Sequence, residues 1–378
     1  MYNNKSTFEA ICKELGIENV PKRSNYSSLK PVGVGTPFVE SLTSYLTRLA
    51  EIHCVNVTDI VMEACVNIKW VNEYATYLND HDSLVEEIVH HLEKNIICRE
   101  LNPLTLINWR FVDRGIVRRN KAWCPICFFQ WQESNQIMYE PLIWCFKIID
   151  ICIIHHTLLE TSCPSCNRKL KYFYKGVKVG YCPHCCKSLA KSPISTELPQ
   201  IPENEKLLKQ KYIILNIAEL LENNQYLKNN DTKESIQKIL DKIIYKHYDN
   251  NLAEFARDVQ RMPFKIWGWR KGTNKPQLDN IIWLAIILNT SVFSLLKGRD
   301  IKKVIIDNTA NKLYVKKKYR PNISEIIKNA LEEAMLEEPP PSLSQIAKRV
   351  SCRPHFVKKK FPEECKIITK RRYDYRKK

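Results

Sequence analysis

Apolar residues recur at intervals of three and four between residues 38 and 50, which predicts an amphipathic helix. The residues on this predicted face are Phe38, Leu42, Tyr45, Leu46 and Leu49. A second helix is expected after the cap-like pair Thr58-Asp59, and helical spacing continues to about residue 120. Little of this region has a sequence pattern typical of a β-strand. The pattern therefore predicts a mainly α-helical chain that begins with a helix–turn–helix domain.

A second helical region, residues 236–298, has the helix spacing typical of a repressor-like helix–turn–helix. A first helix is predicted from Leu252 to Val259, a reading helix over residues 263–269, and a third helix from Leu278. We expect Ile266 and Trp269 to lie in the core. The DNA-binding candidates on the opposite side of the reading helix are Lys265, Trp267, Arg270 and Lys271. The alternative is a plain helical bundle whose basic residues are solvated.

A third helix–turn–helix is predicted in residues 342–378. Ser342 is a suitable cap for its first helix, and Pro354 suits the first turn of its second helix. The side chains expected to face inward are Leu343, Ile346, Ala347, Val350, Phe356, Val357 and Phe361. The candidates for DNA contact are Arg353, His355, Lys358 and Lys359 in the second helix and Arg371 and Arg372 in a basic tail.

Composition changes and proline-rich breaks divide the chain further. Nine of the 15 cysteines lie in residues 121–190, which predicts two small zinc-finger or zinc-ribbon modules. The six predicted parts are a helical helix–turn–helix domain (1–120), a double zinc-binding domain (121–190), a linker and helix (191–235), a repressor-like helix–turn–helix (236–300), a basic connector and helix (301–341), and a C-terminal helix–turn–helix with a basic tail (342–378).

The formal net charge of +18 indicates a polyanionic partner, with nucleic acid favoured over membrane. From residue 301 onward, 21 Lys and Arg stand against 9 Asp and Glu, an excess of +12. A solvated charged tail is the alternative, and the adjacent helix–turn–helix pattern favours DNA contact. Only nine glycines occur and no phosphate-binding glycine motif is present, which argues against nucleotide hydrolysis. The longest apolar run is too short to cross a bilayer, so a soluble cytoplasmic protein is expected.

Four residue pairs share a two-residue gap: Cys124/Cys127, Cys152/His155, Cys163/Cys166 and Cys182/Cys185. In a reducing compartment such pairs bind metal more often than they form disulfides, and two pairs complete a tetrahedral zinc site. Pairing them in order gives one site of three cysteines and a histidine and a second site of four cysteines, hence two Zn²⁺ ions. A crossed arrangement, in which the first and third pairs share one ion, is also compatible with the spacing.

The first predicted site spans 24 intervening residues, long enough for a helix carrying Trp131, Trp144 and Phe146. His156 and Cys186 are adjacent spare ligands that break the two-residue gap. Structural thiols without metal are the plain alternative. A catalytic zinc is disfavoured because eight ligands close two sites, and no catalytic residues are predicted.

The ordered series Trp123-Cys124-Pro125-x-Cys127, Trp144, Cys152-x-x-His155, Cys163-Pro164-x-Cys166 and Gly180-Tyr181-Cys182-x-x-Cys185 resembles the TniQ/TnsD family of transposition target selectors. The stretch from Glu40 to Ala50 resembles the first helix–turn–helix of that family. The resemblance covers about residues 30–190. Ile153-Ile154 replaces the Pro-containing gap that the family often shows before its histidine.

The resemblance implies a non-catalytic, sequence-specific DNA-binding selector in the bacterial cytoplasm, associated with the nucleoid. Such a protein recognises a chromosomal attachment site on double-stranded DNA and recruits a TnsC-like AAA+ ATPase, which engages the transposase of a Tn7-like transposon. The alternative within the family is an adaptor linking a CRISPR RNA-guided complex to transposition. Outside it, a nuclease or other zinc enzyme and an ordinary zinc-stabilised transcription regulator are the competing hypotheses.

Overall fold

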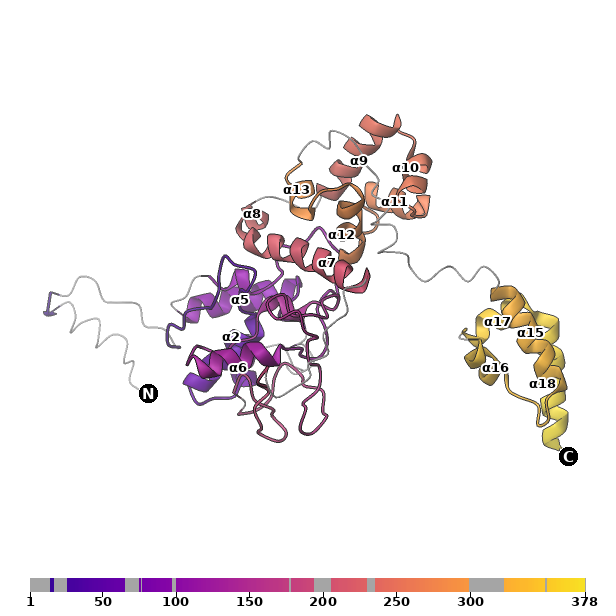
Figure 1. Cartoon of the computed structure of the whole chain (residues 1–378), viewed down its shortest axis with the longest axis horizontal. Helices are drawn as coiled ribbons and strands as arrows, with labels where there is room; N and C mark the ends of the chain where they lie inside the picture. The colour runs from indigo at the N-terminus through magenta and orange to yellow at the C-terminus, as the bar shows by residue number, and fades with distance from the viewer. Residues whose placement is uncertain are drawn as a thin grey trace. The chain divides into compact units, whose positions relative to one another are not determined.

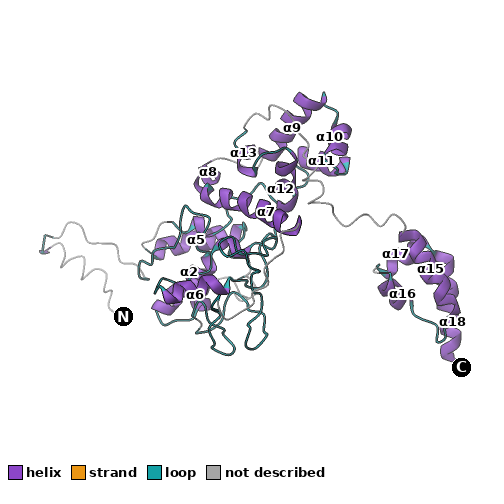
Figure 2. Ribbon diagram, viewed as in Figure 1, coloured by secondary structure: helices purple, strands orange, loops and turns teal. Residues whose placement is uncertain are grey.

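The computed structural model of the chain is mainly helical (Figure 1). It describes residues 14–16, 26–64, 75, 77–96, 100–176, 178–193, 205–229, 235–298, 323–350 and 352–377. Within these ranges lie 15 α-helices, two 3-10 helices and isolated β-bridges, so the expectation of a mainly α fold is confirmed (Figure 2). The chain divides into two compact units, Met1–Tyr314 and Val315–Lys378.

The N-terminal part of the first unit contains the described helices α2 (Leu42–Ile52), α3 (Val57–Ala64) and α5 (Ser83–Asn95). The Ser41 side chain caps α2 by accepting a hydrogen bond from the backbone N–H of Ser44. Nine of the 11 residues of α2 are buried, because α2 runs through the centre of this domain. Phe38 precedes this helix, and Thr58 and Asp59 lie in the first turn of α3, not before it as the sequence suggested.

A buried ion pair fixes the start of α2. The Glu40 carboxylate, fully buried, accepts hydrogen bonds from the Arg48 guanidinium, the Ser44 hydroxyl (2.8 Å) and the backbone N–H of Val32 (3.2 Å). Burial raises the pKa of Glu40, and the Arg48 charge opposes that rise. The Ser44 hydroxyl also accepts the backbone N–H of Glu140 at 2.9 Å. The network therefore joins the first helix to a loop about 100 residues further along the chain.

Residues 100–193 contain little regular structure. The helices here are η1 (Asn102–Leu104), α6 (Pro125–Glu133) and η2 (Leu142–Cys145), and turns with isolated bridges form the rest. The single helix expected to carry Trp131, Trp144 and Phe146 is therefore wrong, because Trp144 lies in η2 and Phe146 follows it. Trp131 of α6 nevertheless stacks on Trp144, with ring centroids 5.9 Å apart, which holds α6 against η2.

The remaining described residues of the first unit are mainly helical: α7 (Glu205–Glu222), α8 (Asn224–Asn229), α9 (Ser235–Tyr248), α10 (Leu252–Asp258), α11 (Pro263–Arg270), α12 (Leu278–Ile287) and α13 (Val292–Leu296). α7 and α8 lie in residues 191–235, where the sequence predicted a linker and helix. Nine of the ten residues of α12 are buried, because α12 packs between neighbouring helices. α7 packs on α12 and α13, so it shares their core.

The helical part of the first unit is tied to residues 100–160 by polar contacts. The Gln210 side chain accepts the backbone N–H of Asp150 (2.9 Å) and donates to the Ile148 carbonyl (3.0 Å). The backbone N–H of Asp113 donates to the Pro276 carbonyl at 2.9 Å. These bonds satisfy backbone groups of a region with little regular structure, and α7 and the loop before α12 are thereby fixed against it.

The second unit contains α15 (Ile323–Leu336), α16 (Leu343–Arg349), α17 (Pro354–Lys360) and α18 (Pro362–Lys377). Ser342 and Gln345 form a capping box at the start of α16, where the sequence predicted a cap. α15 packs on α16 and α18, so this unit begins before residue 342. Residues 301–322, at the start of the predicted basic connector and helix (301–341), lie outside the described residues. No described helix in either unit has the length and apolarity needed to cross a membrane.

We predict that Arg48→Ala destabilises the first unit by about 3–5 kcal/mol, because it leaves Glu40 buried without its cation. The matched control is Arg110→Ala, which removes an ion pair to Glu86 whose two side chains are half exposed, and little change is expected there. Urea unfolding followed by tryptophan fluorescence measures both variants. Equal losses of stability would contradict the assignment of a structural role to the buried pair.

Candidate metal centres and nucleic-acid contacts

Three of the four ligand turns have the same backbone geometry. In each, the first cysteine accepts through its carbonyl the N–H of the residue four positions later, and its own N–H donates to the carbonyl five positions later. The residue at the fourth position has positive φ: His156 (53°), Asn167 (56°) and Cys186 (58°). His156 and Cys186 therefore shape their turns, which leaves His155 and Cys185 as ligand candidates, as the two-residue gap predicted.

The first ligand pair is built differently. Cys124 occupies the N-cap position of α6, Pro125 is its first residue, and Cys127 lies in the first turn. Proline at this position loses no helical hydrogen bond and has the φ that a helix needs. This pair therefore shares the two-residue gap of the other three pairs but not their turn geometry, although its two sulfur atoms still converge.

The eight predicted ligands gather into two sets, paired in order along the sequence. In each set the ligand atoms lie within 4.8 Å of one another: Cys124, Cys127, Cys152 and His155 form the first set, and Cys163, Cys166, Cys182 and Cys185 form the second. The crossed arrangement does not occur.

The distances within each set fit a tetrahedral metal. Four sulfur ligands about 2.3 Å from a zinc ion lie about 3.8 Å from one another. The Sγ atoms of Cys127 and Cys152 are 3.7 Å apart in the first set, as are those of Cys163 and Cys185 in the second. His155 Nδ1 lies 3.3 Å from Cys127 Sγ, so Nδ1 is the ring nitrogen that faces the centre. Both sets could hold a metal ion, and their donor chemistry is consistent with zinc.

The thiols of the first set oppose one another's deprotonation. Hydrogen bonds from Cys127 and Cys152 lower the pKa of Cys124 to about 2. The bond to Cys124 in turn raises the pKa of Cys152 to about 12, and it raises that of Cys127 well above its ordinary value. The set therefore holds one thiolate readily, and loss of the remaining protons requires a cation at its centre.

Gln130 contacts the first set without being one of its ligands. It lies one helical turn beyond Cys127 on α6, and its Oε1 is 3.0 Å from His155 Nε2. A histidine that binds metal through one ring nitrogen commonly donates its other N–H to such an acceptor, which fixes the ring and its tautomer. Gln130 was not among the site residues predicted from the sequence. It could have been found from its position three residues after Cys127, in a segment that begins with a proline.

Two further sulfur atoms lie near the sets but belong to neither. Cys145 is buried in the core, where its sulfur accepts a hydrogen bond from Asn79 Nδ2 (3.4 Å) and burial raises its pKa to about 12. Cys186 is exposed in its turn. Their positions explain why only seven of the nine cysteines in residues 121–190 converge.

On α11, the proposed reading helix, Ile266 and Trp269 are buried as expected, and Lys265, Trp267 and Lys271 are exposed. The expectation that Arg270 is exposed is wrong. Its guanidinium pairs with Asp241 (2.5 Å) and with Asn250 Oδ1 (2.7 Å), and this contact holds α11 against α9.

In the second unit, Val357 is buried, whereas Phe356 is 42% exposed and does not face inward as predicted. The candidate contacts on and beside α17 are exposed, namely Arg353, His355, Lys358 and Lys359.

The predicted basic tail is not a tail but the end of α18, and its two arginines have structural partners. Arg371 donates to the carbonyls of Ala334 and Met335 at the end of α15. Arg372 donates to the Pro340 carbonyl at 3.2 Å and to Gln345 Oε1 at 3.0 Å. Arg371 and Arg372 thus fasten α18 to the rest of the second unit, and their guanidinium groups are not free for a ligand.

Comparison with protein-family models matches residues 31–159 to TniQ, a family of Tn7-like transposon proteins. The matched segment contains the Glu40–Arg48 pair and all four ligands of the first set, and it ends four residues before Cys163. No curated protein sequence matches the chain.

We predict that Cys152→Ser and Cys163→Ser each lower the zinc content of the purified chain from two ions to one, because each removes one ligand from a different set. Cys186→Ser is the matched control and should retain both ions. Metal analysis by mass spectrometry measures the stoichiometry. Two ions in either ligand variant would exclude that cysteine as a ligand.

We also predict that Gln130→Ala lowers the zinc affinity of the first set by about 10- to 100-fold, because the His155 ring loses its acceptor. Gln132→Ala, on the same helix but in contact with Ser188, should leave the affinity unchanged. Competition with a chromogenic chelator measures both constants. An unchanged affinity in Gln130→Ala would show that Gln130 does not orient the ring.

Proposed function

We propose that this chain, which carries a TniQ domain, selects the target DNA of a Tn7-like transposon by binding a chromosomal attachment site directly. It then recruits a AAA+ regulator and, through it, the transposase. The observation that carries the proposal is the joining of a TniQ domain to two further helix–turn–helix arrangements with exposed cations. A chain built only to bridge other proteins would have no need of them.

The first arrangement is formed by α10 and α11. α11 packs on α9 and α10 through buried Ile266 and Trp269, so its other side is available to a ligand. That side presents Lys265 and Trp267, and Lys271 follows at the end of the helix. A reading helix lies in the major groove of DNA with its outer residues toward the bases. We assign these three residues to that contact.

The second arrangement is formed by α16 and α17. Val357 anchors α17 in the core, and α17 ends in three consecutive lysines. Lys358 and Lys359 are exposed, and so are Arg353 and His355 at the start of the helix. Cations at both ends of a short helix suit contacts with phosphates on the two sides of a groove.

The proposed role is non-catalytic. Each metal set supplies four protein ligands, and a zinc ion held by four protein ligands keeps no position for water or substrate. The metals would therefore stabilise the fold, and the steps that consume ATP or cut DNA would belong to the partners.

Selection of bound fragments tests direct recognition. The purified full chain is incubated with sheared chromosomal DNA of the host, and the bound fragments are sequenced against the input. Direct recognition predicts enrichment of one attachment site, with binding about 10³-fold or more tighter than to random duplex. Uniform recovery of all fragments, or recovery only in the presence of an RNA-containing effector complex, would overturn direct recognition.

We predict that Lys358→Ala with Lys359→Ala weakens DNA binding at every sequence and lowers the salt slope of the binding constant by about 2, because each lysine is assigned to a phosphate. The control pair is Lys328→Ala with Lys366→Ala, which removes the same charge from α15 and α18, where both lysines pair with neighbouring glutamates. Titrations at several salt concentrations compare the variants. An identical slope in both pairs would place Lys358 and Lys359 away from DNA.

A further inference from the structure

The two metal modules differ sharply in charge. The first metal module, residues 121–160, has two lysines and four carboxylates. The second metal module, residues 161–190, has six Lys and Arg residues and no carboxylate. Even with four thiolates and one divalent ion, which together contribute −2, the second metal module keeps a net charge of about +4. Such a density of cations without counter-charges in 30 residues needs an explanation.

Thiolate stabilisation does not account for these cations. The first metal module also brings three buried cysteines together, yet it carries an excess of carboxylates. Cations are therefore not required for this ligand chemistry in this fold. Five of the six are also exposed without an ion pair among the described residues, so they do not stabilise the module by pairing: Arg168, Lys169, Lys171, Lys175 and Lys187.

The turn geometry places cations at matching points of the module. Arg168 and Lys187 occupy the same position in the two knuckles, where each carbonyl accepts the N–H of the first cysteine. The side chains of the two knuckles meet at the surface, because Arg168 Nη1 lies 3.2 Å from His184 Nδ1. His184 Nε2 in turn lies 3.3 Å from the Tyr174 hydroxyl. Arg168, His184 and Tyr174 thus form a connected polar surface across both halves of the module.

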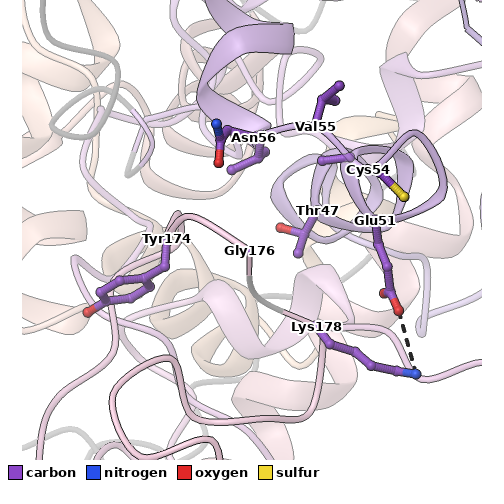
Figure 3. A pocket seen from close by; sticks show the side chains of 10 residues that line it. Thr47, Glu51, Cys54, Val55, Asn56, Tyr174, Gly176 and Lys178 are labelled. Carbon is purple, nitrogen blue, oxygen red and sulfur yellow. Dashed lines mark ion pairs between the residues drawn. The ribbon is translucent and has the colours of Figure 1, made fainter.

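The sixth cation, Lys178, attaches the module to the N-terminal domain. Its Nζ pairs with Glu51 at the end of α2 at 3.5 Å, and a pocket of about 370 Å³ lies between the α2–α3 turn and the segment carrying Tyr174 and Gly176 (Figure 3). α3 exposes Asp59 and Glu63 and has no basic residue. Between α3 and the second metal module, only the second metal module has exposed cations that suit contact with phosphate.

We propose that the second metal module binds the phosphate backbone of double-stranded DNA, independently of base sequence. The module has no exposed large aromatic side chain among its described residues, so it lacks a platform on which single-stranded bases could stack. Exposed Lys and Arg side chains contact phosphate oxygens, and such contacts carry no base-sequence information. The inference rests on the proposed DNA-binding function and adds a contact surface that neither α11 nor α17 provides.

The test is a triple variant of the full chain, Lys169→Ala with Lys171→Ala and Lys175→Ala. At about 0.1 M salt we expect about 10- to 100-fold weaker binding to attachment-site and random duplex alike, with a salt slope reduced by about 2 to 3. The preference for the attachment site should stay the same, and the zinc content should stay at two ions. The triple replacement of the same residues by arginine should restore the binding of the original chain.

The matched control is Lys30→Ala with Lys94→Ala and Lys228→Ala, three exposed lysines elsewhere in the first unit. An equal loss in the control would assign the effect to net charge and overturn the proposal, as would unchanged binding in the test variant. A larger loss on an RNA hairpin than on duplex DNA would overturn the assignment to DNA. If the original chain itself binds no DNA, the proposed function fails; if it binds and the triple variant matches it, only this inference fails.

Discussion

The close approach of four ligand side chains in each of two sets is the constraint on which residues 121–190 depend. Apart from α6 and η2, this region contains turns and isolated bridges, so its backbone has few repeating hydrogen bonds to hold it. Sulfur atoms 3.7 Å apart are unfavourable as several thiolates and favourable around a divalent cation. With a divalent ion in each set, folding of this region and metal binding would be a single equilibrium. The partly buried ring of Trp131 stacks on buried Trp144 and adds an apolar contact that a metal ion alone could not supply.

The same region reaches the first helix through polar groups. Ser44 donates to Glu40 and accepts from the backbone N–H of Glu140, which lies between α6 and η2. The helix α6, which carries Cys127 of the first set, leads into the loop that carries Glu140, so the network and the first set lie on adjoining stretches of chain. A buried charge pair depends on every partner, because an unpaired carboxylate in the core is costly. The TniQ match spans both the network and the first metal set.

Sequence reasoning located the features that depend on local spacing. The two-residue gaps identified the eight side chains that converge, and the Ser342 cap and the Ile266 and Trp269 core positions follow from helical periodicity. It failed where the partner is distant. Arg270 pairs with Asp241, 29 residues away, and Arg371 donates to Met335, 36 residues away. The local sequence therefore could not distinguish either arginine from an exposed cation. Sequence reasoning grouped Cys124 and Cys127 with the other three pairs by their gap alone, although Pro125 at the first helical position was a local signal for α6.

The proposed DNA-binding function requires two kinds of contact, one with the backbone of any duplex and one with the bases of a particular site. The exposed cations divide between these two kinds of contact. Residues on fixed turns, as in the second metal module, have little conformational freedom to lose on binding, so they suit contacts that every duplex offers. Side chains on a helix such as α11 can enter a groove, where base edges distinguish one sequence from another. Arginines already engaged with carbonyls contribute to neither task, and the proposed base-reading surface is therefore Lys265, Trp267 and Lys271 of α11. Affinity and specificity would then be carried by different elements, so mutations should be able to alter one without the other.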